Sequence, residues 1–133
     1  MSADQTTSPI TGVRTVGVPV VDQDRALEFY LGKLGFAKGI DMMFGPGGRW
    51  AEVVPPGSPT SIALVLAGEG SPAGIDTQVR FTTADAAEAH AELTARGVDV
   101  DAEILRYPVP MFAFRDQDGN RLVIVEAPKS RVR

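Results

Sequence analysis

Apolar and polar residues alternate with a period of two near the N-terminus of the chain, between residues 13 and 21. The apolar face of this pattern consists of three valines, Val16, Val18 and Val20. Such alternation predicts a half-buried strand. Asp22 then has the residue type of a helix N-cap, apolar residues follow at helical spacing, and Gly35 is a typical helix end. We therefore predict a strand followed by a helix of about three turns.

Three further strand-like runs follow this helix, at residues 36–44, 49–54 and 61–66. Clusters of glycine and proline at residues 45–48 and 55–59 separate them and interrupt regular structure. The first half of the chain therefore predicts the order strand, helix, strand, strand, strand.

The same order recurs after a glycine- and proline-containing linker. A helix is predicted between Asp85 and Gly97, and the strand-like runs of this half are residues 77–83, 98–105, 111–115 and 121–125. The two predicted N-caps, Asp22 and Asp85, lie 63 residues apart, and the two helix-ending glycines lie 62 residues apart. This agreement indicates a tandem duplication of one unit.

The fold class that follows is α+β, with two tandem βαβββ modules. We predict a single domain over residues 13–128 between flexible tails at 1–12 and 129–133. Its parts are module one at 13–67, a linker at 68–75 and module two at 76–128. Each module alone leaves one sheet face uncovered, so paired modules would form a half-open curved sheet, a cup, with the helices outside.

The last two strand-like runs flank a turn cluster, Asp116-Gln117-Asp118-Gly119-Asn120. Strands rich in aromatic and β-branched residues on either side of such a cluster predict a hairpin. Its position near the end of the repeat makes it the most distinctive local signal in the chain.

Composition excludes several classes of function. The 133 residues carry a formal net charge of -4, which disfavours a nucleic-acid partner. The chain contains no cysteine, so thiolate chemistry and disulfides are excluded. No apolar run approaches the roughly 20 residues of a membrane span, and the first ten residues lack the apolar core of a signal peptide. We therefore expect a cytoplasmic protein with neither a membrane nor a nucleic-acid partner.

The sequence resembles the vicinal oxygen chelate superfamily of glyoxalases, bleomycin-resistance proteins and extradiol dioxygenases. The segments that carry the resemblance are residues 20–22, 25–30, 34–36, 95–98 and 114–120. One departure is Gln117, where the family usually has proline. The resemblance implies the βαβββ repeat, a cleft that binds small molecules, and a homodimer.

Metal-dependent members of that family place four His, Glu or Gln ligands on the first and last strands of the two modules. The resemblance assigns these positions to Thr15, Ala63, Gln78 and Val123. Alanine and valine have no lone pairs for a metal, so we predict no metal and no cofactor.

The resemblance, together with the alternation along the strands and the loop-proximal position of Trp50, assigns a set of residues to the ligand-binding face of the cup, with a dry end and a polar end. They are Thr15, Gly17, Trp50, Ala63, Gln78, Arg80, Met111, Arg121 and Val123. The candidate catalytic residue is Glu52, although the sequence favours a carboxylate paired with an arginine at the strand surface over a general base in the cleft. The single histidine, His90, falls in the second helix and is expected to be structural.

These observations favour a metal-free protein that binds a small molecule, such as an antibiotic or an aromatic metabolite, and sequesters it. The alternative is a glyoxalase-like lyase, epimerase or dioxygenase with a non-standard active site. A third interpretation is an interaction module that uses the fold as a dimer scaffold. The sequence therefore leaves open whether the protein is an enzyme, although the missing ligands favour a binding protein.

Overall fold

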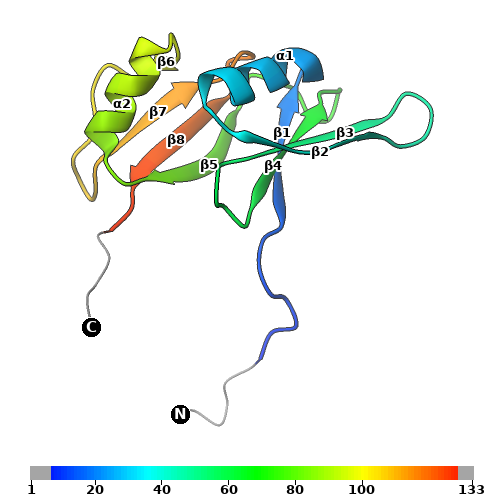
Figure 1. The fold of residues 1–133 in the computed structure, drawn as a ribbon, viewed down its shortest axis with the longest axis horizontal. Helices are drawn as coiled ribbons and strands as arrows, with labels where there is room; N and C mark the ends of the chain where they lie inside the picture. The colour runs from blue at the N-terminus through cyan, green and yellow to red at the C-terminus, as the bar shows by residue number, and fades with distance from the viewer. Residues whose placement is uncertain (1–6, 129–133) are drawn as a thin grey trace.

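The computed structural model describes residues 7–128, which fold into two layers of strands and helices (Figure 1). Module one contains β1 (Thr15–Val20), α1 (Gln23–Leu27), a π-helical turn η1 (Glu28–Lys33), β2 (Ala37–Met43), β3 (Arg49–Val54) and β4 (Ser61–Leu66). Module two contains β5 (Asp76–Thr83), α2 (Ala86–Ala95), β6 (Asp99–Val100), β7 (Met111–Arg115) and β8 (Arg121–Glu126). Both helical segments lie on the same side of the strands (Figure 1).

The two modules have the same strand topology. The first sheet has the order β1-β4-β3-β2 and the second β5-β8-β7-β6. In each sheet the first strand pairs in parallel with the last strand of its module, and the helix makes the crossover. The α+β class and the two βαβββ units are thus as predicted, with the described strands in two four-stranded sheets and no closed barrel. No helix within residues 7–128 is long and apolar enough to cross a membrane.

The predicted helix starts are correct. Asp22 accepts a hydrogen bond from the Arg25 amide at 3.1 Å, and Asp85 accepts one from the Glu88 amide at 3.0 Å. Each carboxylate thereby satisfies an amide of the first helical turn that has no partner within the helix.

Two elements differ from the sequence prediction. The first helix changes after Leu27 into the π-helical turn η1, where the Leu34 amide donates to the carbonyl of Phe29. The strand predicted at 98–105 shortens to β6, since the Asp101 carbonyl accepts from His90 and the Asp101 carboxylate pairs with Arg115. Of the tails expected at 1–12 and 129–133, residues 1–6 and 129–133 lie outside the described residues.

A continuous apolar layer lies between the helices and the sheets. Each module has its own cluster of buried residues, with Tyr30 and Phe114 among the largest side chains. Four side chains pack against both clusters: Phe29, Leu34, Val79 and Phe81. The modules therefore share one core rather than folding as separate units.

The turn of the β7–β8 hairpin joins the two modules through buried polar groups. Tyr30 donates its hydroxyl to the Asp116 carboxylate at 2.8 Å, and the Asn120 amide donates to the carbonyl of Pro19 at 2.8 Å. Asp116 is 6% exposed and Asn120 is fully buried. Because a buried polar group without a partner is costly, this arrangement strongly favours one placement of the modules.

A second, reciprocal contact joins the two helical segments. Lys33 donates its ammonium to the Arg96 carbonyl at 2.7 Å, and the Arg96 guanidinium donates to the Lys33 carbonyl at 3.1 Å. The two residues are 63 positions apart, the same offset as the two N-caps. The contact therefore joins equivalent points of the repeat.

Replacing Tyr30 by phenylalanine should weaken the junction between the modules. Burial, together with the neighbouring Asp116, raises the pKa of Tyr30 well above its usual value, so the hydroxyl stays protonated and donating. We expect Tyr30→Phe to lower the free energy of unfolding in urea by about 2 kcal/mol, typical of a lost hydrogen bond to a charged group. Tyr107→Phe is the matched control. Tyr107 is 88% exposed, so the loss of its hydroxyl should not change the free energy of unfolding. Equal stability of Tyr30→Phe and the wild type would contradict this role.

Candidate functional site

Four of the predicted cup residues share the face of the first sheet that points away from the helices. Val18 and Val20 are fully buried in the core, so Thr15 and Gly17 point to the opposite side of β1. Cross-strand pairing of Gly17 with Ala63, and of Ala63 with Glu52, extends this side to β4 and β3. Trp50 lies two residues before Glu52 and shares its side. We call this side the first open face.

A second open face lies on the sheet of module two. Arg80 pairs with Val123, Val123 with Ala113, and Met111 with Val125, which places Arg80, Met111 and Val123 on one side. Arg121, two residues before Val123, shares this side and forms an ion pair with Asp76 at 3.2 Å. Phe112 and Phe114 point the other way and are buried in the core.

Gln78 does not follow the alternation that placed it beside Arg80. The pairing of β5 with β8 shifts between Asp76 and Arg80, and Gln78 has a φ of 64°, in the left-handed region. An irregularity of this kind resets the period of two, so counting back from Arg80 is wrong for this residue. Gln78 is exposed, and the hydroxyl of Thr15, the equivalent position of the repeat, donates to the Ser61 carbonyl.

Two hollows contain only some of the predicted residues. A shallow one of about 470 Å³ on module one is lined by Arg14, Ile40, Met42, Phe44 and Trp50. A larger groove of about 970 Å³ runs between the modules and includes Gln78 and Arg80. The predicted residues are therefore divided between two sheet faces in one chain.

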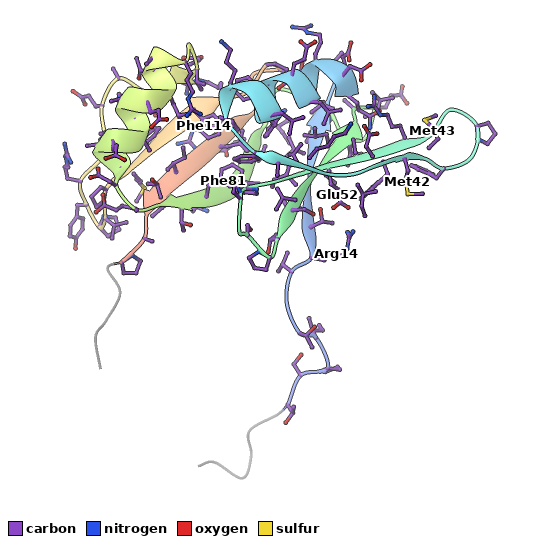
Figure 2. All side chains as sticks on the ribbon, in the orientation of Figure 1. Arg14, Met42, Met43, Glu52, Phe81 and Phe114 are labelled. Carbon is purple, nitrogen blue, oxygen red and sulfur yellow. The ribbon has the colours of Figure 1, made fainter. Side chains whose placement is uncertain are left out.

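Glu52 is the centre of a buried polar cluster on the first open face. Its carboxylate accepts from the Trp50 indole at 2.6 Å, from the Arg14 guanidinium at 3.0 Å and from the Ser61 hydroxyl at 2.9 Å. Glu52 is only 4% exposed, whereas the Arg14 side chain is 64% exposed. Figure 2 shows Arg14 and Glu52 close together below the strands, with Met42 farther along the β2–β3 hairpin.

This cluster decides what Glu52 can do chemically. The Trp50 hydrogen bond holds the pKa of Glu52 below its usual value against the opposing effect of burial, with further help from Ser61 and Arg14. A lowered pKa and occupied oxygens make the carboxylate a poor general base. Its evident role is to fix the indole of Trp50 and the guanidinium of Arg14 on the open face.

His90 lies away from both open faces. Its Nε2 atom lies 2.6 Å from the Asp101 carbonyl and therefore carries the hydrogen, and its ring packs edge-on against Phe112 at 5.0 Å. Both contacts are on the helix side of the second sheet. The structural role expected for this histidine agrees with these contacts.

Comparison with known proteins identifies the family. Residues 12–124 match the model of the Glyoxalase/Bleomycin resistance protein/Dioxygenase superfamily. The chain belongs to this superfamily. Among solved structures it is similar to TnmS3, an antibiotic binding protein from Streptomyces sp. CB03234, with 32% identity, a TM-score of 0.81 and coverage of 92% of this chain and 100% of that one.

Two further relatives support the same assignment. A superfamily member from Sphaerobacter thermophilus is 37% identical, with a TM-score of 0.81, over 89% of this chain and 98% of that one. The uncharacterized protein YurT of Bacillus subtilis is 33% identical over 118 residues, which cover 80% of this chain and 92% of that protein.

The positions that hold a metal in metal-dependent superfamily members do not fit one here. Ala63 and Val123 carry no donor atom, the Thr15 hydroxyl donates to a backbone carbonyl, and Gln78 lies in the irregular part of β5. Within residues 7–128 no three His, Asp or Glu side chains are grouped as metal ligands. A divalent cation needs several such donors at once.

Sequence reasoning missed the residues that complete the Glu52 cluster. Arg14 precedes β1, and Ser61 begins β4, so neither lies near Glu52 in the sequence. Arg14 and Glu52 can be recognised as a pair only when the register of the strands, including that of β3 with β4, is known. The sequence leaves Met42 and Phe44 open between ligand contact and core or interface packing, and it assigns no role to Ile40.

Glu52→Gln should destabilise the protein in a pH-dependent manner. At neutral pH the amide cannot satisfy three donors, so we expect the free energy of unfolding to fall by about 1–3 kcal/mol. Because the folded-state pKa lies below the ordinary 4.5, the carboxylate contributes fully above pH 4.5 and loses its contribution as the pH falls through the lower value. Urea unfolding followed by the emission of Trp50, the only tryptophan of the chain, measures both effects.

The control for this prediction is Glu103→Gln, at an exposed position in the connection after β6. It should leave stability unchanged at each pH. A constant difference between Glu52→Gln and wild type from neutral to acidic pH would contradict the proposed charge on Glu52.

Proposed function

We propose that this protein binds a small, largely apolar molecule on its open sheet faces and sequesters it without a metal ion. The observation that carries the proposal is the fixed pair of Trp50 and Arg14, held by the buried Glu52 beside an apolar hollow. A ligand site of this kind combines apolar walls with a few well-placed polar groups.

The chemistry of the hollow favours an aromatic ligand. The indole of Trp50 offers a face for stacking, and its orientation is set before the ligand arrives. The flexible side chain of Met42 can adapt to the shape of the ligand, and the ring of Phe44 adds an aromatic contact. The exposed Arg14 guanidinium can pair with an anionic or carbonyl group of the ligand.

The relatives support binding of this kind. TnmS3, to which the chain is similar over nearly its whole length, is an antibiotic binding protein. An antibiotic or a related aromatic metabolite is therefore the ligand class that we propose. On the second open face, Met111 and Val123 would contribute apolar contacts.

We favour binding over turnover for two reasons. Two of the four positions that the resemblance assigns to metal ligands, Ala63 and Val123, lack donor atoms, and the candidate base Glu52 is already engaged by three partners. Among the described residues of the first open face, no group is therefore left in a state suited to proton abstraction.

The expected cytoplasmic location remains part of the proposal, and a fluorescent fusion tests it.

We further propose that the protein is a homodimer and that the cup is completed between two chains. The β2–β3 hairpin projects beyond the helices (Figure 1). Three apolar residues at its end are exposed to solvent: Met42 is 57% exposed, Met43 63% and Phe44 56%. Apolar side chains gathered on a projecting element are typical of an interface. A partner packed there would bring its second open face towards the first open face of this chain.

A screen of antibiotics and aromatic natural products tests the binding function. In the presence of a chelator, at least one compound should raise the melting temperature and quench the emission of Trp50. Calorimetry should then show that Trp50→Leu weakens its binding about tenfold, equivalent to about 1.4 kcal/mol of lost stacking. Tyr107→Leu serves as the control, because this aromatic residue lines neither of the two hollows. Silence across a broad panel, or binding that disappears with the chelator, would rule out metal-free sequestration.

Charged substitutions on the hairpin test the dimer. Sedimentation equilibrium should give the mass of two chains for the wild type and of one chain for Met42→Lys/Phe44→Lys, because two lysines cannot be buried against an apolar surface. Val21→Lys, at another exposed apolar position, should remain dimeric. A wild-type protein with the mass of one chain would disprove the dimer.

A further inference from the structure

The groove between the modules lies on a different side of the sheets from the first open face. It has a volume of about 970 Å³ and is lined by every residue from Thr77 to Thr83, which form the free edge of the second sheet. Its deeper walls include Phe81 and Phe114, whose side chains point to the helix side (Figure 2). Trp50 and Ala63 do not border it.

Aromatic rings form the floor of this groove. Phe36 packs edge-on against Phe81, with ring centroids 5.3 Å apart, and Phe81 stacks on Phe114 at 6.3 Å. Phe114 is fully buried, but Phe36 and Phe81 are only half-buried. Part of the shared core is thus accessible from the groove, which favours a ligand with its own aromatic surface.

The rim of the groove carries an unbalanced positive charge. Within residues 7–128 Arg80 has no carboxylate within ion-pair distance, and its guanidinium makes only a long contact of 3.4 Å with the Gln78 carbonyl. The other charged pair at the rim, Arg96 with Glu92, is neutral overall, and Arg96 is also bound to the carbonyl of Lys33. An anion at the rim would therefore find one available cation.

The wall opposite β5 is stiff. Three prolines, Pro55, Pro56 and Pro59, lie in the loop between β3 and β4, and the Ser58 amide donates to the Pro55 carbonyl at 2.9 Å. The Ser58 hydroxyl accepts from the Thr60 amide at 3.1 Å. A wall with restricted backbone angles loses little entropy when a ligand binds.

The free edge of β5 is poorly suited to an added strand. Gln78 adopts a left-handed conformation, its amide donates to the Asp76 carboxylate at 3.1 Å, and the Val79 amide donates to the Thr77 hydroxyl at 3.1 Å. These local bonds occupy amides that a pairing strand would need. The edge therefore favours a compact ligand over a peptide.

We propose that this groove, at the free edge of β5 and distinct from the hollow at Trp50, is a second binding site for a planar aromatic anion such as an arene carboxylate or sulfonate. The rings of Phe36 and Phe81 contact its aromatic part and Arg80 pairs with its acidic group. The volume lies within the range of about 300–1,000 Å³ that is usual for small-molecule sites.

Two fluorescent probes of the same shape test this assignment. Anilinonaphthalene sulfonate carries the acidic group, and N-phenylnaphthylamine lacks it. We expect Arg80→Gln to weaken the sulfonate about fivefold to tenfold, as for a lost exposed charge-assisted contact, and to leave the neutral probe unchanged. Arg25→Gln, at another arginine without an ion pair in the described residues, is the control and should bind both probes like wild type.

The location of the sulfonate is read from backbone amide chemical shifts. The proposal expects the largest changes at Val16, Phe81 and Ile124, and sulfonate binding that Trp50→Leu leaves intact. Changes centred on Trp50 and Ala63, equal weakening by Arg25→Gln, or no sulfonate binding would overturn the groove site. Because the groove is expected to bind the sulfonate without Trp50, whereas the proposed function requires Trp50, these readouts separate failure of the groove site from failure of the site at Trp50.

Discussion

The buried contact between the hairpin turn of module two and the strand–helix junction of module one determines how the two halves of this protein meet. Asp116 and Asn120 use their side chains to tie the turn to itself and to reach Tyr30 and Pro19. Asn120 also accepts from the amides of Gly74 and Ile75, which fixes the end of the linker. In an environment of low dielectric constant such a network permits little variation in geometry.

The positions of the open faces follow from this junction. Each βαβββ unit covers one side of its sheet with its own helix and leaves the other side free. Because the junction holds both helices on one side of the sheets, the uncovered faces of the two sheets both lie on the side opposite the shared core. Gln117, where the superfamily usually has proline, leaves its Oε1 atom buried without a partner but donates to Asp118 within the same turn.

The local patterns in the sequence were sufficient for the order of elements and the repeat. Alternating valines, the N-caps Asp22 and Asp85, and the hairpin cluster are signals that act within a few residues, and each has its expected structure. The boundaries of the domain and its linker remain predictions.

The site was harder to predict because it depends on register between distant strands. The irregular pairing at Gln78 interrupted a simple count, and two partners of Glu52, Arg14 and Ser61, come from other segments that only the folded chain brings to it. Apolar hairpin residues such as Met42 were also ambiguous, since core, interface and ligand contact all require the same residue types.

The central claim is that the fixed indole of Trp50 receives a small molecule without the help of a metal ion. A crystal structure of the protein with the tightest compound from the screen tests this most directly. The account predicts an aromatic ring of the compound stacked on Trp50, with Glu52 still accepting from the indole and no metal ion between ligand and protein. A metal ion bridging the compound to Thr15 or Gln78, or a compound bound with no contact to Trp50, would contradict it.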